Sequence, residues 1–402
     1  MNAIPRFSPS LQIRDIIQGL LDREAEDPLV LFCREFADFI GVRHAIPAPS
    51  ARAGLAALVR ALGFRTGAEV LIPGLTFHSV PAVFRAAGFA CRFVDIREDT
   101  YCLDPDRIAQ AVGPRTAAIV PVHLYGRACE MDRVLRLANE KGLTVIEDCA
   151  QGCGAATAGR RVGSWGRAGI FSFHVAKNLA ALNFGMVTTD DPDLAGRVQR
   201  ALSNIPRVGR PELSSTALFA AAMDLVTRRW FWQTFAAPVL RLCAELGKDP
   251  IEALTSERPD GTPGVLGASP RPLQARIARR ILRRVDEENS LRRRNAECLR
   301  EALQEVPRIG LPAPSSEREN IYLSFVVRVD DRERFRRALM RRGVDTHPGN
   351  MSVGPEIPGF AGSGECPVSS RTARRLVHLP IHARLDHEDI RRIAEAVKEV
   401  LR

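Results

Sequence analysis

Two short segments of the sequence contain polar side chains that could do chemistry. Each comes at the end of an apolar segment: Val145–Gln151 (VIEDCAQ) contains Glu147 and Asp148, and Ser172–Lys177 (SFHVAK) ends on a lysine. Ligands of α/β sheets bind at the carboxyl ends of the strands. If the two apolar segments are parallel strands, a carboxylate and a lysine therefore lie where a ligand would bind.

A lysine and a carboxylate in this setting suit one cofactor in particular. Burial beyond a strand favours the neutral, nucleophilic form of a lysine amine. Pyridoxal 5'-phosphate (PLP) needs such an amine for its aldehyde, and a carboxylate that keeps its pyridine nitrogen protonated, so that the ring withdraws electrons. Either signal alone is weak, because an aspartate after a strand is about twice as often a turn or cap residue.

The order of several motifs makes the signal more specific. They resemble those of the DegT/DnrJ/StrS family of PLP-dependent sugar aminotransferases, which have the aspartate-aminotransferase fold, also called fold type I. The resemblance extends from about Phe36 to the C-terminus. In chain order the motifs are Ser50–Gly63 (SARAGLAALVRALG), Glu69–Phe77 (EVLIPGLTF), His123–Gly126 (HLYG), Glu147–Gln151 (EDCAQ), Ser172–Leu179 (SFHVAKNL), and Cys366–Val368 followed by His378–His382 (CPV, HLPIH).

The resemblance implies roles for three residues around the reactive end of the cofactor. Lys177 would hold PLP covalently and carry the proton between the amino donor and the cofactor. Asp148 would pair with the pyridine nitrogen. Gln151 would contact the ring hydroxyl.

The resemblance also implies a phosphate site and a ring contact. Ser172 would bind the phosphate through its hydroxyl, and Ala51 and Arg52 would offer backbone N–H groups at a helix N-terminus, which favours anions. Arg52 could add a cationic contact. Phe77 would stack on the pyridine ring, a contact worth about 0.5–1.5 kcal/mol beyond burial.

Other polar residues are candidates for substrate contacts. They are His174 and Asn183, on either side of Lys177, and His347. Asn183 lies in Leu182–Gly185, where the family usually has Gly-Glu-Gly-Gly. For His123, a structural role at a strand end is favoured over a catalytic one, because Lys177 already serves as the proton carrier.

The pattern of apolar residues predicts the strands and helices that must position these residues. Short apolar segments alternate with helical patterns such as Ser79–Ala87 and Met131–Lys141, which is typical of a parallel sheet covered by helices. The expected strands are Val70–Ile72, Cys91–Val94, Ala117–Val122, Leu143–Ile146, Gly169–Phe173 and Met186–Thr189.

The C-terminal part predicts a smaller α/β unit. Leu273–Leu303 reads as one long Arg-rich helix, followed by a strand (Tyr322–Val329), a helix (Arg332–Arg342), a strand (Arg375–Leu379) and a closing helix (His387–Leu401). We therefore expect a large PLP-binding α/β domain at residues 1–270, with an apolar helical insert at about 205–260. A small C-terminal α/β domain would occupy residues 271–402.

Composition excludes several function classes. The chain has 57 Lys+Arg against 47 Asp+Glu and 45% hydrophobic residues, as in a globular protein. Arg-rich Arg276–Arg284 is typical of a solvated helix face, and no aromatic platform or helix-turn-helix indicates a nucleic-acid partner. Met1–Gln12 lacks a signal-peptide core, and the apolar run Ala217–Met223 is too short to span a bilayer. These features predict a cytoplasmic protein without a transmembrane segment, with peripheral membrane contact as an alternative.

The nine cysteines are scattered and odd in number, so we expect free thiols. Cys149 and Cys153 are the closest pair, but no second pair with zinc-site spacing follows them. No metal site is expected.

The resemblance implies a homodimeric aminotransferase that transfers an amino group from an amino acid, in the first place glutamate, to a keto sugar that is linked to a nucleotide. Three alternatives remain open. A non-sugar carbonyl, such as an aminocyclitol precursor or a lipid-linked ketone, is suggested by the apolar segment Thr216–Leu246. A PLP-dependent sugar dehydratase would have histidine in place of Lys177, and a non-catalytic regulator would have lost Lys177 or Asp148.

Overall fold

The computed structural model describes residues 3–203, 210–246, 248–249, 269–314 and 318–402. Within these residues a seven-stranded sheet has the order β1-β10-β9-β6-β5-β2-β4. In that order the strands are His44–Ala48, Gly185–Thr189, Ala168–Ser172, Thr144–Asp148, Thr116–Ile119, Glu69–Pro73 and Ala90–Val94. β10 is antiparallel to β1 and β9, and the other pairs are parallel. The predicted, mostly parallel sheet is confirmed.

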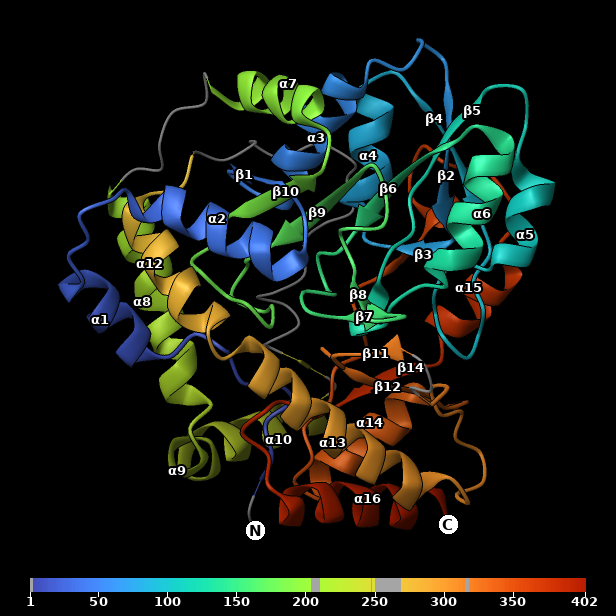
Figure 1. Ribbon diagram of the computed structural model, residues 1–402. Coiled ribbons are helices and arrows are strands. Elements are labelled where there is room, and N and C mark those ends of the chain that lie inside the picture. The colour runs from blue at the N-terminus through green and yellow to red at the C-terminus, as the bar shows by residue number, and fades with distance from the viewer. Residues whose placement is uncertain (1–2, 204–209, 247, 250–268, 315–317) are drawn as a thin grey trace.

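Helices cover both faces of this sheet (Figure 1). On one face, α3 (Ala51–Leu62), α4 (Ser79–Ala86) and α7 (Pro192–Ser203) share a hydrophobic core with Ile170. On the other face, α5 (Pro105–Ala111) and α6 (Met131–Lys141) form one core, and α2 (Pro28–Ile40) packs against Phe171 in another. Ile170 and Phe171 are neighbours in β9 and enter opposite cores, because successive strand side chains point to opposite faces.

The C-terminal residues form a smaller layered unit, at the bottom of Figure 1. β12 (Phe325–Arg328) pairs antiparallel with β14 (Leu376–Leu379). Side chains of α13 (Val285–Leu303), α14 (Arg332–Arg341) and α16 (His387–Leu401) pack in one core with these strands and with Ile4 near the N-terminus.

Short strand pairs connect distant parts of the chain. β11 (Arg318–Glu319) pairs with β7 (Ala156–Thr157), which pairs with β8 (Arg160–Arg161), and β13 (Ser352–Val353) pairs with β3 (Leu75–Thr76). One-turn helices at Leu124–Gly126 and Gly354–Glu356, and α15 (Pro367–Ala373), complete the connections.

The prediction of one long helix over Leu273–Leu303 is wrong. The structure has two helices, α12 (Pro272–Leu282) and α13, separated at Arg283 and Arg284. α12 packs in the core of the large sheet beside α1 (Ile13–Leu21) and α2, whereas the second half of α13 packs against α16. Tertiary packing in two different cores requires the break, and no glycine or proline marks it.

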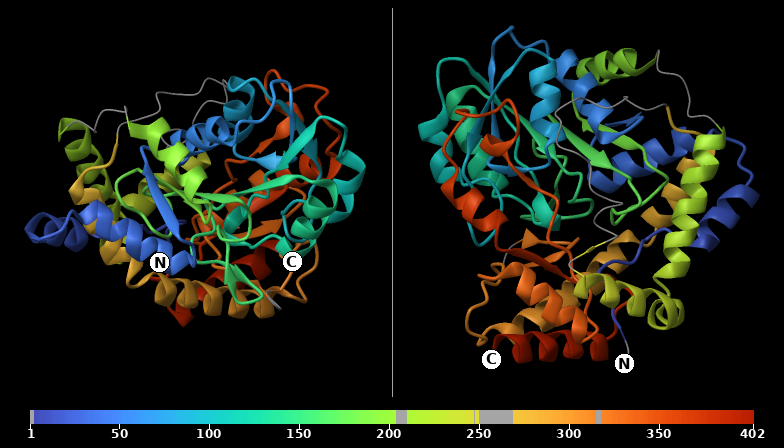
Figure 2. Two further views of the ribbon diagram at one scale, coloured as in Figure 1. Left: turned by 45° about the horizontal axis from the view of Figure 1, so that its top comes forward. Right: turned by 180° about the vertical axis from the view of Figure 1, so that it is seen from behind.

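The apolar insert is helical where it is described. α8 (Arg210–Val226) is followed by α9 (Arg229–Phe231), a π-helical turn (Trp232–Ala236) and α10 (Ala237–Glu245). α8 packs beside α1 and leads to α10, which contacts α14, as the rear view in Figure 2 shows. Residues 204–209, 247 and 250–268, which include part of the predicted insert, lie outside the described residues. None of the helices described is long and apolar enough to cross a membrane.

Candidate active site

The start of α3 and the ends of β9 and β10 meet at one point. Gly185 pairs with Ser172 on one side and with Ala48 on the other. A Cβ atom at Gly185 would lie 2.4 Å from the backbone nitrogen of Ala51, so only glycine allows this approach. The hydroxyl of Ser50 accepts the N–H of Ala53 (3.1 Å) and caps α3.

This junction has the properties of an anion site. Ser172, Ala51 and Arg52 are half-buried, and the backbone N–H groups at the N-terminus of α3 carry a partial positive charge. The structure therefore brings together three residues that the sequence predicted as phosphate contacts. It adds Gly185, which in the sequence is the last residue of the altered segment Leu182–Gly185. A glycine at the first position of an apolar strand was the signal for it.

Asp148 is the last residue of β6 and is 5% exposed. Its Oδ1 accepts the N–H of Ala150 (3.0 Å), and its backbone carbonyl accepts the N–H of His123 (3.0 Å). Burial raises the pKa of the Asp148 carboxyl, and the N–H of Ala150 and the charge of Lys177 counteract this rise. The charge of Lys177 therefore acts on Asp148, although the two residues are 29 positions apart in sequence.

Lys177 lies in the loop between β9 and β10. The backbone of Phe173 closes this loop, because its N–H donates to Phe184 (2.8 Å) and its carbonyl accepts from Ala181 (2.9 Å). The N–H of Lys177 donates to the carbonyl of His174 (2.9 Å), and the lysine is half-buried. The loop is compact and holds the lysine at the carboxyl edge of the sheet.

Gln151 and Phe77 lie in the connections after β6 and β3. The side-chain oxygen of Gln151 accepts the N–H of Tyr125 (2.8 Å), and its amide group donates to the sulfur of Met351 (3.7 Å). Phe77 is half-buried, with its ring centroid 4.3 Å from that of His78. Both residues have their side chains held by neighbours, as a rigid site requires.

Two of the three substrate candidates lie in the Lys177 loop. The Nδ1 of His174 accepts the N–H of Ala176 (3.3 Å), and the Oδ1 of Asn183 accepts the N–H of Val175 (3.2 Å). Both residues are exposed. As contacts to a substrate they stay predictions.

His347 lies instead beside His378 in the C-terminal unit, and both residues are half-buried. Its ring centroid is 5.7 Å from that of His378, whose ring packs against Tyr125. Burial, followed by the charges of Arg6 and Arg336, lowers the pKa of His347 to about 4. The ring is therefore neutral near pH 7, and its role as a substrate contact also stays a prediction.

Glu147, to which the sequence assigned no role of its own, accepts four hydrogen bonds. Its two oxygens are fully buried and accept the N–H groups of Gly163 (2.8 Å), Trp165 (2.7 Å) and Gly166 (2.7 Å), and the Nε2 of His123 at 3.1 Å. Four donors satisfy the carboxylate, so Glu147 fixes the chain beside Asp148. The acidic pair at a strand end was the available signal.

His123 is held on both sides of its ring. Its Nδ1 accepts the N–H of Cys129 (3.1 Å), so Nε2 carries the proton that is donated to Glu147. This arrangement matches the structural role expected for His123. Ligand atoms of His123, Glu147 and Cys149 lie within 4.8 Å of one another. Burial raises the pKa of the Cys149 thiol well above its usual value, and in the same cluster His123 and Glu147 are hydrogen-bonded to each other.

Comparison with known proteins identifies the class to which this fold and site belong. The family model of the DegT/DnrJ/EryC1/StrS aminotransferase family matches residues 25–214 and 271–398. The chain belongs to this family and is a PLP-dependent aminotransferase.

Individual relatives agree over most of the chain. It is 30% identical to dTDP-3-amino-3,4,6-trideoxy-alpha-D-glucose transaminase of Streptomyces venezuelae, over 92% of this chain and 86% of that protein. It is 31% identical to L-glutamine:2-deoxy-scyllo-inosose aminotransferase of Streptomyces kanamyceticus, over 92% and 84%. Among solved structures, S. venezuelae DesV in complex with a ketimine intermediate has 28% identity and a TM-score of 0.75, covering 97% of this chain and 94% of DesV.

The residues described above fit PLP. The cradle at Gly185 would accept the phosphate beside Ser172 and the start of α3. The buried Asp148 would face the cationic ring nitrogen, and Lys177 lies within the electrostatic reach of Asp148. When bound, PLP supplies a ring that withdraws electrons from the substrate's amino carbon.

Proposed function

We propose that this aminotransferase takes an amino group from glutamate and gives it to the keto group of a nucleotide-linked sugar. The observation that supports the proposal is that the buried Asp148, the loop of Lys177 and the cradle at Gly185 lie at the same edge of the sheet, with the charge of Lys177 acting on Asp148. Relatives at 30% identity whose names specify amino sugars linked to dTDP and UDP support the acceptor class.

In this proposal the residues of the site have different roles. The amine of Lys177 would hold the cofactor through its aldehyde and, once the amino donor has taken its place there, would move a proton at the substrate carbon. Asp148 keeps the ring nitrogen protonated, because a buried carboxylate is stabilised by a cationic partner. Ser172, Ala51 and Arg52 bind the phosphate, while Gln151 contacts the ring hydroxyl and Phe77 the ring face.

A second acceptor class has specific support. The relative from S. kanamyceticus is named for a scyllo-inosose, a cyclic ketone that is not a sugar nucleotide, and for glutamine as donor. An aminocyclitol precursor is therefore the second candidate, with glutamine as the matching donor.

We also propose a homodimer that works in the cytoplasm. The cysteines are free thiols, which fits a reducing compartment. Apolar side chains exposed on α8 and α10 offer a surface that a second copy could cover. Sedimentation equilibrium over a range of protein concentrations tests the dimer.

The chemistry is tested by reduction and peptide mapping. Borohydride treatment of the protein with bound PLP should attach the cofactor to Lys177, and a label on Lys141, Lys248 or Lys398 instead would contradict the assignment. The loaded enzyme should convert glutamate and then be returned to the aldehyde form by a dTDP- or UDP-linked keto sugar. Recovery with scyllo-inosose but with neither sugar nucleotide would select the second candidate.

A further inference from the structure

A serine close to the N-terminus completes the backbone turn that contains Lys177. Ser10 is 4% exposed, and its hydroxyl donates to the carbonyl of Lys177 (3.2 Å) and accepts the N–H of Ala180 (3.1 Å). In an ordinary β-turn the carbonyl of the first residue accepts the N–H of the fourth directly. Here the hydroxyl of Ser10, 167 positions away from Lys177, stands between these two groups.

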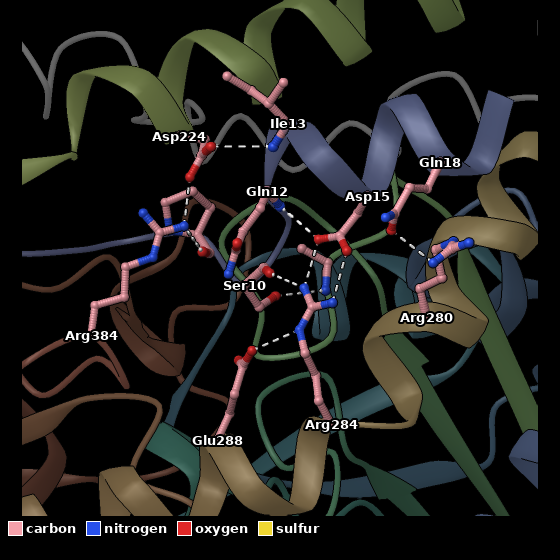
Figure 3. A network of polar contacts seen from close by, with 12 residues as sticks. Ser10, Gln12, Ile13, Asp15, Gln18, Asp224, Arg280, Arg284, Glu288 and Arg384 are labelled. Carbon is pink, nitrogen blue, oxygen red and sulfur yellow. Dashed lines mark hydrogen bonds and ion pairs between the residues drawn. The ribbon is translucent and has the colours of Figure 1, made fainter. Parts of the chain in front are cut away.

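Ser10 itself is held by an arginine at the start of α13 (Figure 3). Arg284 donates to the backbone carbonyl of Ser10 (2.6 Å) and to both carboxylate oxygens of Asp15, at 2.8 and 2.6 Å. Its Nε donates to Glu288 (2.9 Å). Because the guanidinium is a planar fork with fixed donors, it places Ser10 relative to two helices at once.

The N-terminal segment is also attached to α8. Asp224 accepts the N–H of Ile13 (3.2 Å) and a side-chain N–H of Arg384 (2.5 Å), as Figure 3 shows. The exposed fraction of the Asp224 side chain is 1%, so this attachment is inside the fold. Segments from four parts of the chain therefore converge on the residues around Ser10.

A second contact fixes the far side of the turn. Asn178 is 1% exposed, and its amide donates to the carbonyl of Cys153 (2.6 Å) and to the Oδ1 of Asn289 (3.1 Å). With the residue after Lys177 anchored in this way, the separation between the carbonyl of Lys177 and the N–H of Ala180 depends on the hydroxyl of Ser10.

We propose that Ser10 is a positioning residue for Lys177, one that sets the place from which the lysine amine reaches the cofactor aldehyde. The inference rests on the proposed role of Lys177. In Ser10→Ala the two backbone groups either bond to each other directly or lose their partners, and both outcomes move the backbone of Lys177. A displacement of about 1 Å can cost about 100-fold in rate.

Reconstitution of the cofactor-free protein tests the idea without measuring transamination. PLP binds first through its phosphate, and Lys177 then condenses with the aldehyde as one water leaves, so the two steps separate in stopped-flow absorbance. We expect Ser10→Ala to slow the limiting rate of the covalent step by about 10- to 100-fold, with the affinity of the first step within about 2-fold of wild type. Ser10→Thr, which keeps the hydroxyl, should recover most of the rate.

Ser8→Ala is the matched control. Ser8 is also 4% exposed, and its hydroxyl has no hydrogen-bond partner in the part of the chain that the structure describes. It should capture PLP at the wild-type rate, and thermal unfolding should show that all three variants are folded at the assay temperature.

Two results overturn the proposal: equal capture rates for Ser10→Ala and Ser8→Ala, or a Ser10→Thr variant no faster than Ser10→Ala. The failure of the proposed function looks different, because borohydride would then label wild-type protein at a lysine other than Lys177.

Discussion

The carboxyl edge of the central sheet buries polar side chains, whereas the helices α8–α10 expose apolar ones. At the sheet edge, Glu147 accepts four hydrogen bonds and Asp148 is buried beside it. On α8–α10, large apolar side chains are more than half exposed at Leu218, Phe219, Trp230, Phe235, Val239 and Leu242.

The match to the family divides the chain at the same place. The family model covers residues up to 214 and resumes at 271, so most of α8 and all of α9 and α10 lie in its gap. The part of the chain that the family model matches therefore contains the buried carboxylates of the sheet edge, whereas the exposed apolar side chains of α8–α10 lie outside it.

The largest expected effect is that of Lys177→Ala. Transamination should fall by at least about 10,000-fold, the upper end of what a positioned acid–base group contributes, while the fold is retained. Turnover with glutamate and any accepted ketone is the measurement, and cofactor content after dialysis is the control. Residual activity above about 1% of wild type would show that another amine replaces the lysine. The sheet edge would then not be the part of the molecule on which the reaction depends.

A pair of tryptophans sharpens the comparison within α9 and the π-helical turn. Trp232 is 2% exposed and Trp230 is 58% exposed. We expect Trp232→Ala to lower the free energy of unfolding by about 3–5 kcal/mol, and Trp230→Ala to change it by less than about 0.5 kcal/mol. Urea unfolding measures both.

The same titration at several protein concentrations tells whether Trp230 is covered in solution. If Trp230→Ala is as destabilising as Trp232→Ala and the loss depends on concentration, a second copy covers α8–α10. If neither change is destabilising, the packing described for Trp232 is wrong.

Asp148→Asn should lower the rate constant of the glutamate half-reaction by at least about 100-fold, the scale of one strong electrostatic contact to a transition state. Asparagine keeps the shape and accepts the N–H of Ala150, but it cannot hold a proton on the ring nitrogen. Single-turnover absorbance on the fully loaded variant gives the rate. A normal rate would mean that another acid pairs with the ring.

The smallest effect concerns pH. Burial lowers the pKa of His347 to about 4 and that of His382 to about 3. The unfolded chain takes up these protons near pH 6.5, while the folded chain does not, so stability should fall as pH drops from about 6.5 toward 4, by up to about 1.4 kcal/mol per pH unit for each histidine. His347→Asn should remove the contribution of one histidine, up to about 1.4 kcal/mol per pH unit, from this slope. Urea unfolding between pH 4.5 and 6 measures the change. An unchanged slope would show that His347 titrates normally in the fold.

Local patterns predicted much of the fold because their causes are local. Met131–Lys141 and His387–Leu401 were predicted with the bounds that α6 and α16 have. Apolar periodicity also found six strands of the central sheet, while β1 was missed, since His44–Ala48 contains a proline and Ile46 is its one large apolar residue. Arg283 and Arg284 show the limit: good helix formers occupy a break that only packing in two cores requires.

By itself, the sequence determined the class of enzyme, because six motifs in the order of one family are far more specific than a lysine or an aspartate after an apolar strand. What only the tertiary structure decided depends on contacts between residues far apart. The approach of Gly185 to Ala51, the four donors around Glu147 and the hydroxyl of Ser10 inside the Lys177 turn are examples. No spacing rule encodes them, since each exists only when segments up to 170 positions apart are packed together.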